Sequence, residues 1–385
     1  MMKSFSRDCL APTVRYGALA LTLLAAGASQ AQPNSFLSMH TQVIQIASTI
    51  PGNGDVNPYG VARVPVSVGK LQAGSFLISN FNDSANAQGT GTTIVQISPT
   101  NSVNLFASIN PANLPGSCPG GVGLTTAVVA LRSGWVVVGS LPAPAQGSTP
   151  AGTAATAQAG CLLVLNNMGD VVETISGGPI NGPWDMTAVD DGGLAALFVT
   201  NVLNGTVAAT TDFTNPGPVV NKGTVVRVLL LIPPGQKPRV INETIVGSGF
   251  SQHTDPAALV VGPTGVALDL DQDVLYVADT VNSRIAAIRN PLTRFNSAGT
   301  GATVSQNDFL NGPLGIAVAP NGNIITANAG DGNLVETTPG GNQVAKATVD
   351  TSGNPPGSGT LFGLAVTRQG VFFVDDGSNT FNLLH

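Results

Sequence analysis

The chain has 385 residues, of which 47 are glycine and 27 are proline, and this content of chain-breaking residues excludes a mostly helical fold. Charged residues make up only 9% of the chain and hydrophobic residues 43%, a balance that excludes intrinsic disorder and favours short strands joined by neutral turns. The formal net charge is −6, and the 15 Lys and Arg residues are scattered singly. Nucleic acid is therefore not an expected partner, because phosphate binding needs clustered cations.

The first thirty-one residues have the pattern of a secretory signal peptide. Lys3, Arg7 and Arg15 precede an apolar run over 18–28, and Ser29-Gln30-Ala31 then offers the small residues that a signal peptidase reads. We predict cleavage after Ala31 and a mature protein that is secreted or periplasmic. The apolar run is too short to span a bilayer, and no later segment reaches the roughly 20 apolar residues that a span requires, so no membrane span is expected.

Two cysteines, Cys118 and Cys161, remain after removal of the predicted signal peptide. In an oxidising compartment an even pair of cysteines predicts a disulfide, and two unpaired buried thiols are the alternative. A zinc site is not expected, because the same part of the chain offers only three histidines besides these two thiols.

Six segments of the chain repeat one pattern: a start with proline or a small residue, usually a glycine, and then an apolar strand. They begin at Asn57, Cys118, Gly182, Gly262, Gly312 and Thr360. A second apolar run follows each of them after a polar turn, and a third and usually a fourth come next. Four antiparallel strands repeated six times predict an all-β fold, a six-bladed β-propeller that forms one domain over 32–385. The blades are expected at about 57–110, 118–177, 182–248, 262–306, 312–350 and 361–385.

The last repeat and the N-terminal run each lack a partner. The last copy reaches only a third strand, 380–384, whereas the β-rich run 41–50 has no blade of its own. We predict that this N-terminal strand closes the last blade, which removes two sheet edges that would otherwise pair with other chains. A disordered N-terminal leader is the alternative.

The fourth repeat carries a family resemblance. Gly262-Pro-Thr-Gly-Val-Ala-Leu-Asp, then Val274-Leu-Tyr-Val-Ala-Asp-Thr, then Val281-Asn-Ser-Arg-Ile resembles the NHL-repeat signature. Asn311-Gly-Pro-Leu-Gly-Ile-Ala with Asn321-Gly-Asn-Ile-Ile-Thr-Ala-Asn is a second, weaker copy, and the other four copies are degenerate. The resemblance implies a propeller fold, and such propellers include binding modules, lyases and, in related families, lactonases.

One end of the predicted propeller collects the long insertions. In a propeller, the connections from strand four to strand one and from strand two to strand three emerge on the same face. The segments 81–91, 141–160 and 202–222 all follow the second strands of the first three blades. We expect ligand binding on this loop-rich face, because loops on a rigid scaffold commonly carry it, and solvated spacers are the alternative.

Asp185 is the most distinctive single candidate for a ligand-binding residue. The equivalent position of the other repeats is glycine, at Gly60, Gly121, Gly265, Gly315 and Gly363. A carboxylate beside the central axis, with Trp184 before it, is a candidate for holding a polar ligand group or a metal ion. The alternative is that Asp185 caps backbone N–H groups in a turn that enters the strand.

Polar residues also recur where the second strands end: Asp279, Asn328, Asp375 and Asp376, with Asn80 and Asn201 in the same place in earlier blades. They either fix turns or form a ring of oxygen atoms at the channel mouth, of the kind that calcium prefers. His253 is the lone candidate base, and it is expected with Asp255 in the long loop that enters the fourth blade on the same face. No Gly-x-Ser-x-Gly motif is present, and no catalytic residue is identified.

The leading functional hypothesis is an extracytoplasmic, monomeric NHL-type propeller that binds a protein, peptide or carbohydrate ligand on its loop-rich face. No cofactor is assured, and calcium is the candidate. The rival hypothesis, implied by the resemblance, is a metal-dependent enzyme of lactonase or lyase type. Such lactonases use a Glu among their metal ligands, whereas Glu173, Glu243 and Glu336 fall in or near outer strands here. The lyase chemistry relies on His, and no His falls on an inner strand.

Overall fold

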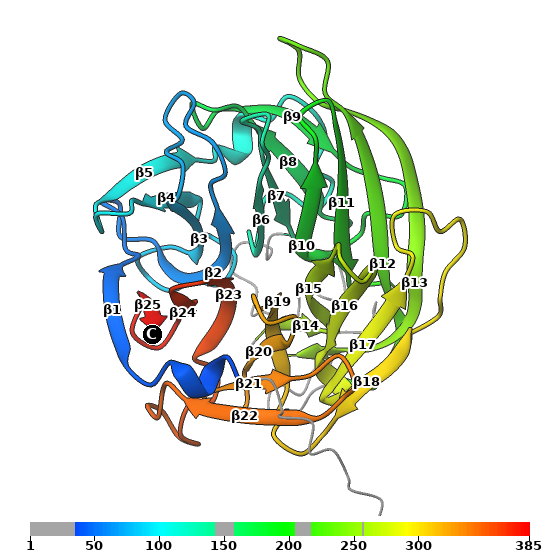
Figure 1. Ribbon diagram of the computed structural model, residues 1–385. Coiled ribbons are helices and arrows are strands. Elements are labelled where there is room, and N and C mark those ends of the chain that lie inside the picture. The colour runs from blue at the N-terminus through cyan, green and yellow to red at the C-terminus, as the bar shows by residue number, and fades with distance from the viewer. Residues whose placement is uncertain (1–34, 143–157, 205–216, 256–257) are drawn as a thin grey trace, which may run out of the picture. The chain divides into compact units, whose positions relative to one another are not determined.

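The computed structural model describes residues 35–142, 158–204, 217–255 and 258–385. The predicted signal peptide with its cleavage site therefore lies outside the described residues, as do parts of the insertions 141–160 and 202–222. Six antiparallel sheets surround a central axis (Figure 1), which confirms the all-β, six-bladed propeller. The helices are three short 3-10 turns: η1 (Leu37–Met39), η2 (Pro111–Asn113) and η3 (Thr280–Asn282). Within the described part of the chain, no helix is long and apolar enough to cross a membrane.

Each blade is one sheet in which the first strand lies nearest the axis and the next three lie successively farther out; blade 3 has a short fifth strand that pairs with the end of its fourth. Blade 1 contains β2 (Val56–Arg63), β3 (Phe76–Asn82), β4 (Thr93–Ile97) and β5 (Val103–Ser108). Blade 2 contains β6 (Ala127–Ala130), β7 (Val136–Ser140), β8 (Cys161–Leu165) and β9 (Val171–Ile175). Blade 3 contains β10 (Pro183–Asp190), β11 (Leu194–Asn201), β12 (Val220–Leu231), β13 (Arg239–Asp255) and β14 (Leu259–Val261).

The remaining three blades complete the ring. Blade 4 contains β15 (Pro263–Asp269), β16 (Val274–Asp279), β17 (Arg284–Arg289) and β18 (Ala302–Gln306). Blade 5 contains β19 (Pro313–Val318), β20 (Ile324–Asn328), β21 (Asn333–Thr337) and β22 (Gln343–Thr348). Blade 6 contains β23 (Leu361–Thr367), β24 (Gly370–Asp375), β25 (Thr380–Leu384) and the N-terminal β1 (Val43–Ser48).

The hydrophobic core lies between neighbouring blades. Second and third strands such as β16 and β8 are buried along their whole length, because a blade is covered on both faces. Between blades 6 and 1, the Phe76 ring lies 4.5 Å from the Phe372 ring and 5.1 Å from the Phe381 ring, measured between centroids. Apolar packing between blades therefore holds the ring together.

The first strands approach one another so closely around the axis that one position in each blade has little room for a side chain. A Cβ added to the glycine at this axial position would lie within 2.0–2.6 Å of a backbone oxygen in the next blade. The four glycine–oxygen pairs are Gly60 with Thr126, Gly265 with Leu314, Gly315 with Phe362, and Gly363 with Tyr59. Each contacted oxygen belongs to the residue that precedes the next blade's axial position.

This geometry corrects the predicted match between blade 2 and the other repeats. Gly60 meets the oxygen of Thr126, so the axial residue of blade 2 is Ala127 and not Gly121. β6 begins only at Ala127, whereas Gly121 has a φ of +73° and its N–H donates to the carbonyl of Cys118 in a preceding turn. Sequence spacing could not reveal how many loop residues separate this turn from the strand. Asp185 is therefore one of two departures from an axial glycine.

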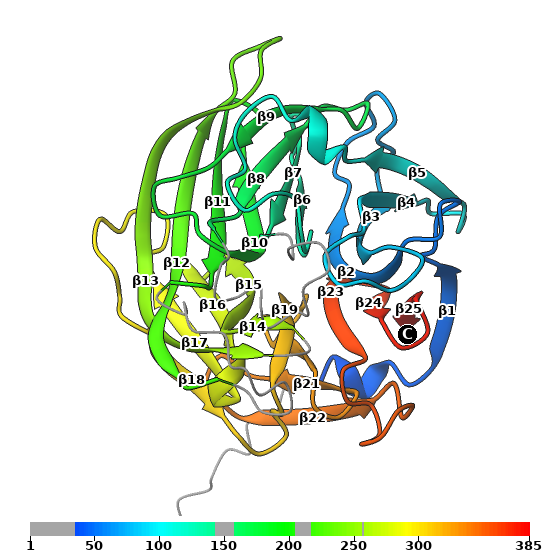
Figure 2. The same ribbon diagram turned by 180° about the vertical axis from the view of Figure 1, so that it is seen from behind.

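The N-terminal strand closes the ring as predicted. β1 pairs antiparallel with β25, with Val43 opposite Leu384 and Ser48 opposite Thr380. The two strands lie side by side in both views of the ring (Figures 1 and 2). Pairing of the first and last strands covers an edge that each would otherwise expose.

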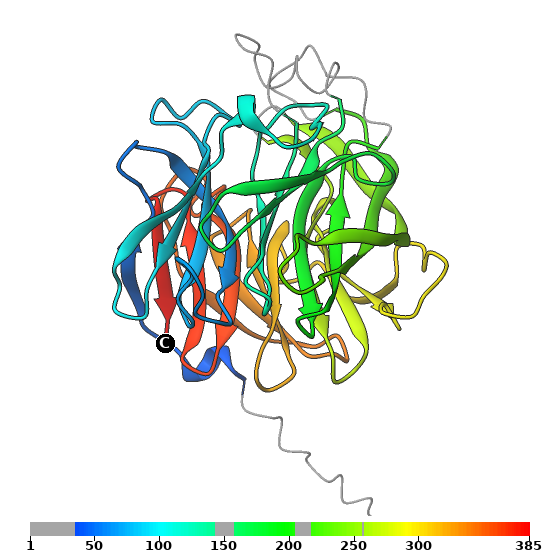
Figure 3. The same cartoon turned by 90° about the horizontal axis from the view of Figure 1, so that it is seen from above.

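A buried carboxylate anchors the chain just before β1. Glu336 on β21 is 0% exposed and accepts hydrogen bonds from five groups. These are Ser35 Oγ at 2.5 Å, Phe36 N at 2.9 Å, Leu37 N at 2.8 Å, Asn321 Nδ2 at 2.9 Å and Asn323 Nδ2 at 2.6 Å. The anchor holds η1 at the same end of the propeller as the C-terminal residue (Figure 3).

The charge of Glu336 makes this anchor sensitive to pH. Burial by itself raises the pKa of the carboxyl, but the hydrogen bonds outweigh burial and the net pKa lies below its ordinary value of 4.5. A depressed carboxyl pKa contributes stability that is present above pH 4.5. That stability is lost as the pH falls through the folded-state pKa.

We expect Glu336→Gln to lower the free energy of unfolding at pH 7 by about 3 kcal/mol, because the amide turns a donor toward groups that are themselves donors. The difference from the wild type should shrink at acidic pH. Urea denaturation at pH 7 and pH 4 measures both effects. Glu173→Gln is the control, since Glu173 forms only a surface ion pair with Lys237 and its loss should cost less than about 1 kcal/mol. Equal effects of the two substitutions would contradict the anchor.

Candidate functional site

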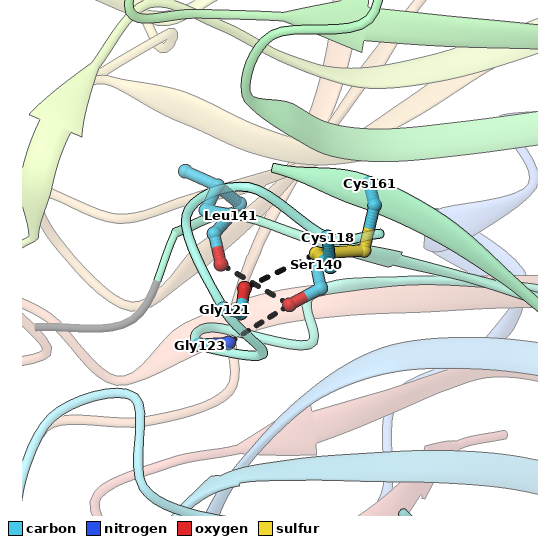
Figure 4. Close-up of a disulfide and its surroundings, with 6 residues drawn as sticks. All are labelled: Cys118, Gly121, Gly123, Ser140, Leu141 and Cys161. Atoms are coloured by element: carbon cyan, nitrogen blue, oxygen red, sulfur yellow. Dashed lines mark hydrogen bonds between the residues drawn. A yellow bond between two sulfur atoms is a disulfide. The ribbon is translucent and has the colours of Figure 1, made fainter. Parts of the chain in front are cut away.

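A disulfide stabilises the base of the loop-rich face in blade 2. Cys118 and Cys161 are bonded, with their Cα atoms 5.3 Å apart, which confirms the predicted pair (Figure 4). Beside the bridge, Ser140 Oγ accepts a hydrogen bond from Gly123 N at 2.9 Å and donates to the carbonyl of Leu141 at 3.1 Å. The bridge thus ties the turn that precedes β6 to the start of β8.

We expect protein that lacks residues 1–31 to show no free thiol when it is denatured without reductant and titrated. The bridge closes a loop with a sequence separation of 43, so Cys118→Ser should lower the free energy of unfolding by about 4 kcal/mol through a less restricted unfolded chain. Two titratable thiols in the denatured wild type would show that the bridge does not form.

A cavity of about 570 Å³ opens on the loop-rich face and is called here the loop-face cavity. Three aromatic residues line it, namely Phe81, Trp184 and Phe362. Its other lining side chains are mostly polar: Asn57, Asn82, Asn86, Gln88, Asp255, Thr280, Ser358 and Asp376. Blades 1, 3, 4, 5 and 6 all contribute, so the cavity exists only when the ring is closed.

Tyr59 connects two of the aromatic residues of this cavity. Its ring is stacked on Phe362 with centroids 4.9 Å apart, and it meets Trp184 edge-on at 6.2 Å. Trp184 Nε1 donates a hydrogen bond to the Tyr59 hydroxyl at 2.5 Å. Burial raises the pKa of Tyr59, and the nearby Asp185 carboxylate adds to this shift, so the hydroxyl stays protonated. The aromatic residues are therefore held in fixed positions relative to one another.

Asp185 lines a different space, called here the channel cavity. The first strands of all six blades form this cavity of about 310 Å³ around the axis. Asp185 Oδ1 accepts a hydrogen bond from Met186 N at 2.8 Å. Burial raises the pKa of Asp185 to about 7, against the opposing effect of the backbone N–H groups of Met186 and Val266.

Trp184 and Asp185 therefore do not share one cavity, although the sequence suggested a common site. Successive residues of a strand point in opposite directions, so Trp184 lines the loop-face cavity and Asp185 the channel cavity. The contact of Asp185 with Met186 N agrees with the alternative interpretation, in which the carboxylate accepts from backbone N–H groups.

We expect Asp185→Asn to stabilise the protein at pH 8 by about 2 kcal/mol and to have little effect at pH 4. A raised carboxyl pKa means that stability falls as the pH rises from the unfolded-state value of 3.8 toward about 7, and the amide removes this loss. Urea denaturation at the two pH values measures the difference. A destabilised variant at pH 8 would mean that the charged form is satisfied, by a cation or by donors.

Four of the polar residues at the ends of the second strands fix turns instead of lining the loop-face cavity. Asp279 is buried and forms an ion pair with Arg284 at 2.7 Å, and both of its oxygens accept hydrogen bonds from Asn282 Nδ2. The other three show local contacts of the same kind: Asn201 Oδ1 accepts from Asn181 N, Asn328 Nδ2 donates to the carbonyl of Phe309, and Asp375 Oδ1 accepts from Ser378 N. The structure thus gives these four residues contacts that stabilise the turns.

The residues that line the loop-face cavity come one position later. Thr280, Ala329 and Asp376 directly follow Asp279, Asn328 and Asp375, and all three are part of the lining. Of the six polar residues expected at the ends of second strands, Asp376 is the one found in the described lining of this cavity. Neighbouring side chains point apart, and only the register of the folded blade decides which of them faces the cavity.

His253 lies in a strand and not in the expected loop. It is part of β13 and pairs with Val261 of β14, and its Nδ1 lies 3.0 Å from the carbonyl oxygen of Thr254. The segment is a strand because β12 and β13 continue their pairing well beyond the predicted third and fourth strands, with Val220 opposite Gln252. Asp255, at the end of β13, does line the loop-face cavity, whereas His253 does not.

Sequence reasoning missed the aromatic residues besides Trp184 and did not select Asp376 over Asp375. A signal for the aromatics was present, because Tyr59, Trp184 and Phe362 each directly precede the axial position of their blade. Because successive side chains of a strand point in opposite directions, these rings could have been predicted to point away from the side that the axial residues face.

The side chains of the site do not fit the calcium site or the lactonase-type metal centre that the sequence suggested. Among the described residues, no group of three or more His, Cys, Asp and Glu side chains lies close enough together to hold a metal ion. The loop-face cavity offers two carboxylates, Asp255 and Asp376, beside three aromatic rings. We therefore derive no metal-dependent step for this site.

The family model of the NHL repeat matches residues 261–288, which cover the end of β14, β15, β16 and most of β17. This match and the six-bladed fold support the resemblance to the NHL-repeat β-propeller family. No curated protein matches the chain.

Solved structures share the fold at low sequence identity. A gluconolactonase from Xanthomonas campestris is 13% identical with a TM-score of 0.51, over 89% of this chain and 88% of that chain. The PQQ-bound aldose sugar dehydrogenase from Streptomyces coelicolor is 14% identical with a TM-score of 0.51, over 89% of this chain and 98% of that chain. These likenesses establish the fold alone.

Proposed function

We propose that this protein is an extracytoplasmic binding module that holds a carbohydrate in the loop-face cavity. The observation that carries this proposal is the combination of an aromatic lining, Phe81, Trp184 and Phe362, with amide side chains in one cavity. A sugar ring presents an apolar C–H face that packs on aromatic rings. Its hydroxyl groups both donate and accept hydrogen bonds, which suits amides such as Asn57 and Gln88.

The dimensions of the cavity favour a small ligand over a protein or a peptide. A volume of about 570 Å³ lies in the range of small-molecule sites, whereas a stable protein interface buries roughly 1,200–2,000 Å² of surface. The disulfide is compatible with a secreted or periplasmic location, because such bonds persist in oxidising compartments. The rival proposal of a metal-dependent lactonase or lyase has less support, since Glu336 holds the N-terminal segment and His253 lies outside the cavity lining.

We expect mono- and disaccharides to change the fluorescence of Trp184 on binding. The protein has two tryptophans, so Trp135→Phe should keep the signal and Trp184→Phe should abolish it. Phe362→Ala should weaken binding about tenfold, which corresponds to about 1.4 kcal/mol of lost ring packing. Fluorescence titration of the three variants with a saccharide panel measures these effects. If no saccharide of the panel changes the Trp184 fluorescence at concentrations up to the millimolar range, the proposal is overturned.

A further inference from the structure

The loop-face cavity is acidic. Asp255 and Asp376 are the charged side chains among its described lining residues, which include no Lys, Arg or His. Asp255 Oδ1 accepts a hydrogen bond from Ala258 N at 3.1 Å. Two carboxylates without a basic residue in one concave site create a negative potential that attracts cations.

Asp376 lines this cavity, and one of its two carboxylate oxygens is buried without a donor. Its Oδ2 accepts a hydrogen bond from Asn57 Nδ2 at 3.3 Å, whereas its Oδ1 is buried and accepts none from the described residues. A buried acceptor without a donor is costly, and more so for a carboxylate than for a neutral group. A positive charge close to the carboxylate would reduce this cost.

Among the described residues, no positive charge compensates the charge of Asp376. Burial raises its pKa to about 7, and the neighbouring Asp375 carboxylate adds to the shift. The pKa of Asp375 is itself raised, by burial first and also by Asp350. The group is thus a carboxylate held among other acids, and a cation in the cavity would stabilise its ionised form.

The aromatic residues of the same cavity also favour a cation. The face of an aromatic ring attracts positive charge, and a site that combines aromatic rings with carboxylates is suited to an organic ammonium group. A bare divalent ion fits less well, because it gains little from the rings and because no group of three or more His, Cys, Asp and Glu side chains among the described residues lies close enough together to hold it.

We propose that the ligand of the loop-face cavity carries a positively charged amine, as an amino sugar does, and that Asp376 is its ion-pair partner. This inference rests on the proposed carbohydrate-binding function and specifies the charge of the ligand. The sugar ring packs on the aromatic residues, the ammonium group pairs with the Asp376 carboxylate, and Asp255 adds to the attraction.

The test compares glucosamine with two neutral sugars, glucose and N-acetylglucosamine, by titration of Trp184 fluorescence and by calorimetry. We expect the wild type to bind glucosamine at least tenfold more tightly than either neutral sugar. Asp376→Asn should abolish this preference, because the amide keeps the shape and loses the charge. Asp271→Asn is the matched control, since it removes the same charge from an exposed position on the β15–β16 hairpin and should keep the preference.

The possible outcomes separate the two proposals. Equal binding of all three sugars, or a preference for glucosamine that survives Asp376→Asn, would overturn the proposal of an amine-bearing ligand. Either result would leave the proposal of carbohydrate binding intact. Binding of none of them would overturn both. A further titration uses calcium chloride alone. Calcium binding that depends on Asp376 and that glucosamine does not displace would also overturn the proposal of an amine-bearing ligand. If Asp376→Asn does not fold by circular dichroism, Asp255→Asn replaces it, with a reduced glucosamine preference expected and an unchanged one contrary to the proposal.

Discussion

The close approach of the first strands around the axis is the constraint on which the rest of the structure depends. At four axial positions, a side chain would enter the backbone of the next blade, so glycine is required there. Ala127 and Asp185 are the two departures. Of the six residues that directly precede an axial position, Trp184, Leu314 and Phe362 line the loop-face cavity. Three of the six residues, Tyr59, Trp184 and Phe362, are aromatic, so the steric requirement at the axis also places the rings that line or support the loop-face cavity.

The two ends of the described chain are fixed away from the loop-rich face. β1 completes blade 6 by pairing with β25, and the Glu336 carboxylate holds the residues before β1 beside the hairpin between β19 and β20. The closing contacts combine backbone pairing, a buried charge with matched donors and apolar packing between blades. Ring closure thereby brings side chains from five blades into one cavity. The contacts that close the ring do not occupy the loop-rich face, on which this cavity opens.

The two cavities on the axis differ in their chemistry. The channel cavity is formed by inner strands and contains the Asp185 carboxylate, which contacts backbone N–H groups. The loop-face cavity combines aromatic rings, amides and two acids, and one acid oxygen there lacks a donor among the described residues. A small amine-bearing ligand would place a positive charge beside the acids and cover the rings, whereas the channel cavity offers no aromatic surface among its described lining residues.

The amino-acid sequence by itself determined most of the strands, the sixfold repeat, the closing strand and the disulfide. These follow from local periodicity, from repeats along the chain and from an even pair of cysteines. It did not determine that Ala127 and not Gly121 is axial in blade 2, because loop length hides where a strand begins. Nor could it choose Asp376 over Asp375 or separate Trp184 from Asp185. Which of two adjacent side chains faces a cavity depends on strand register, and which residues from distant blades meet depends on closure of the ring, so only the tertiary structure decided both.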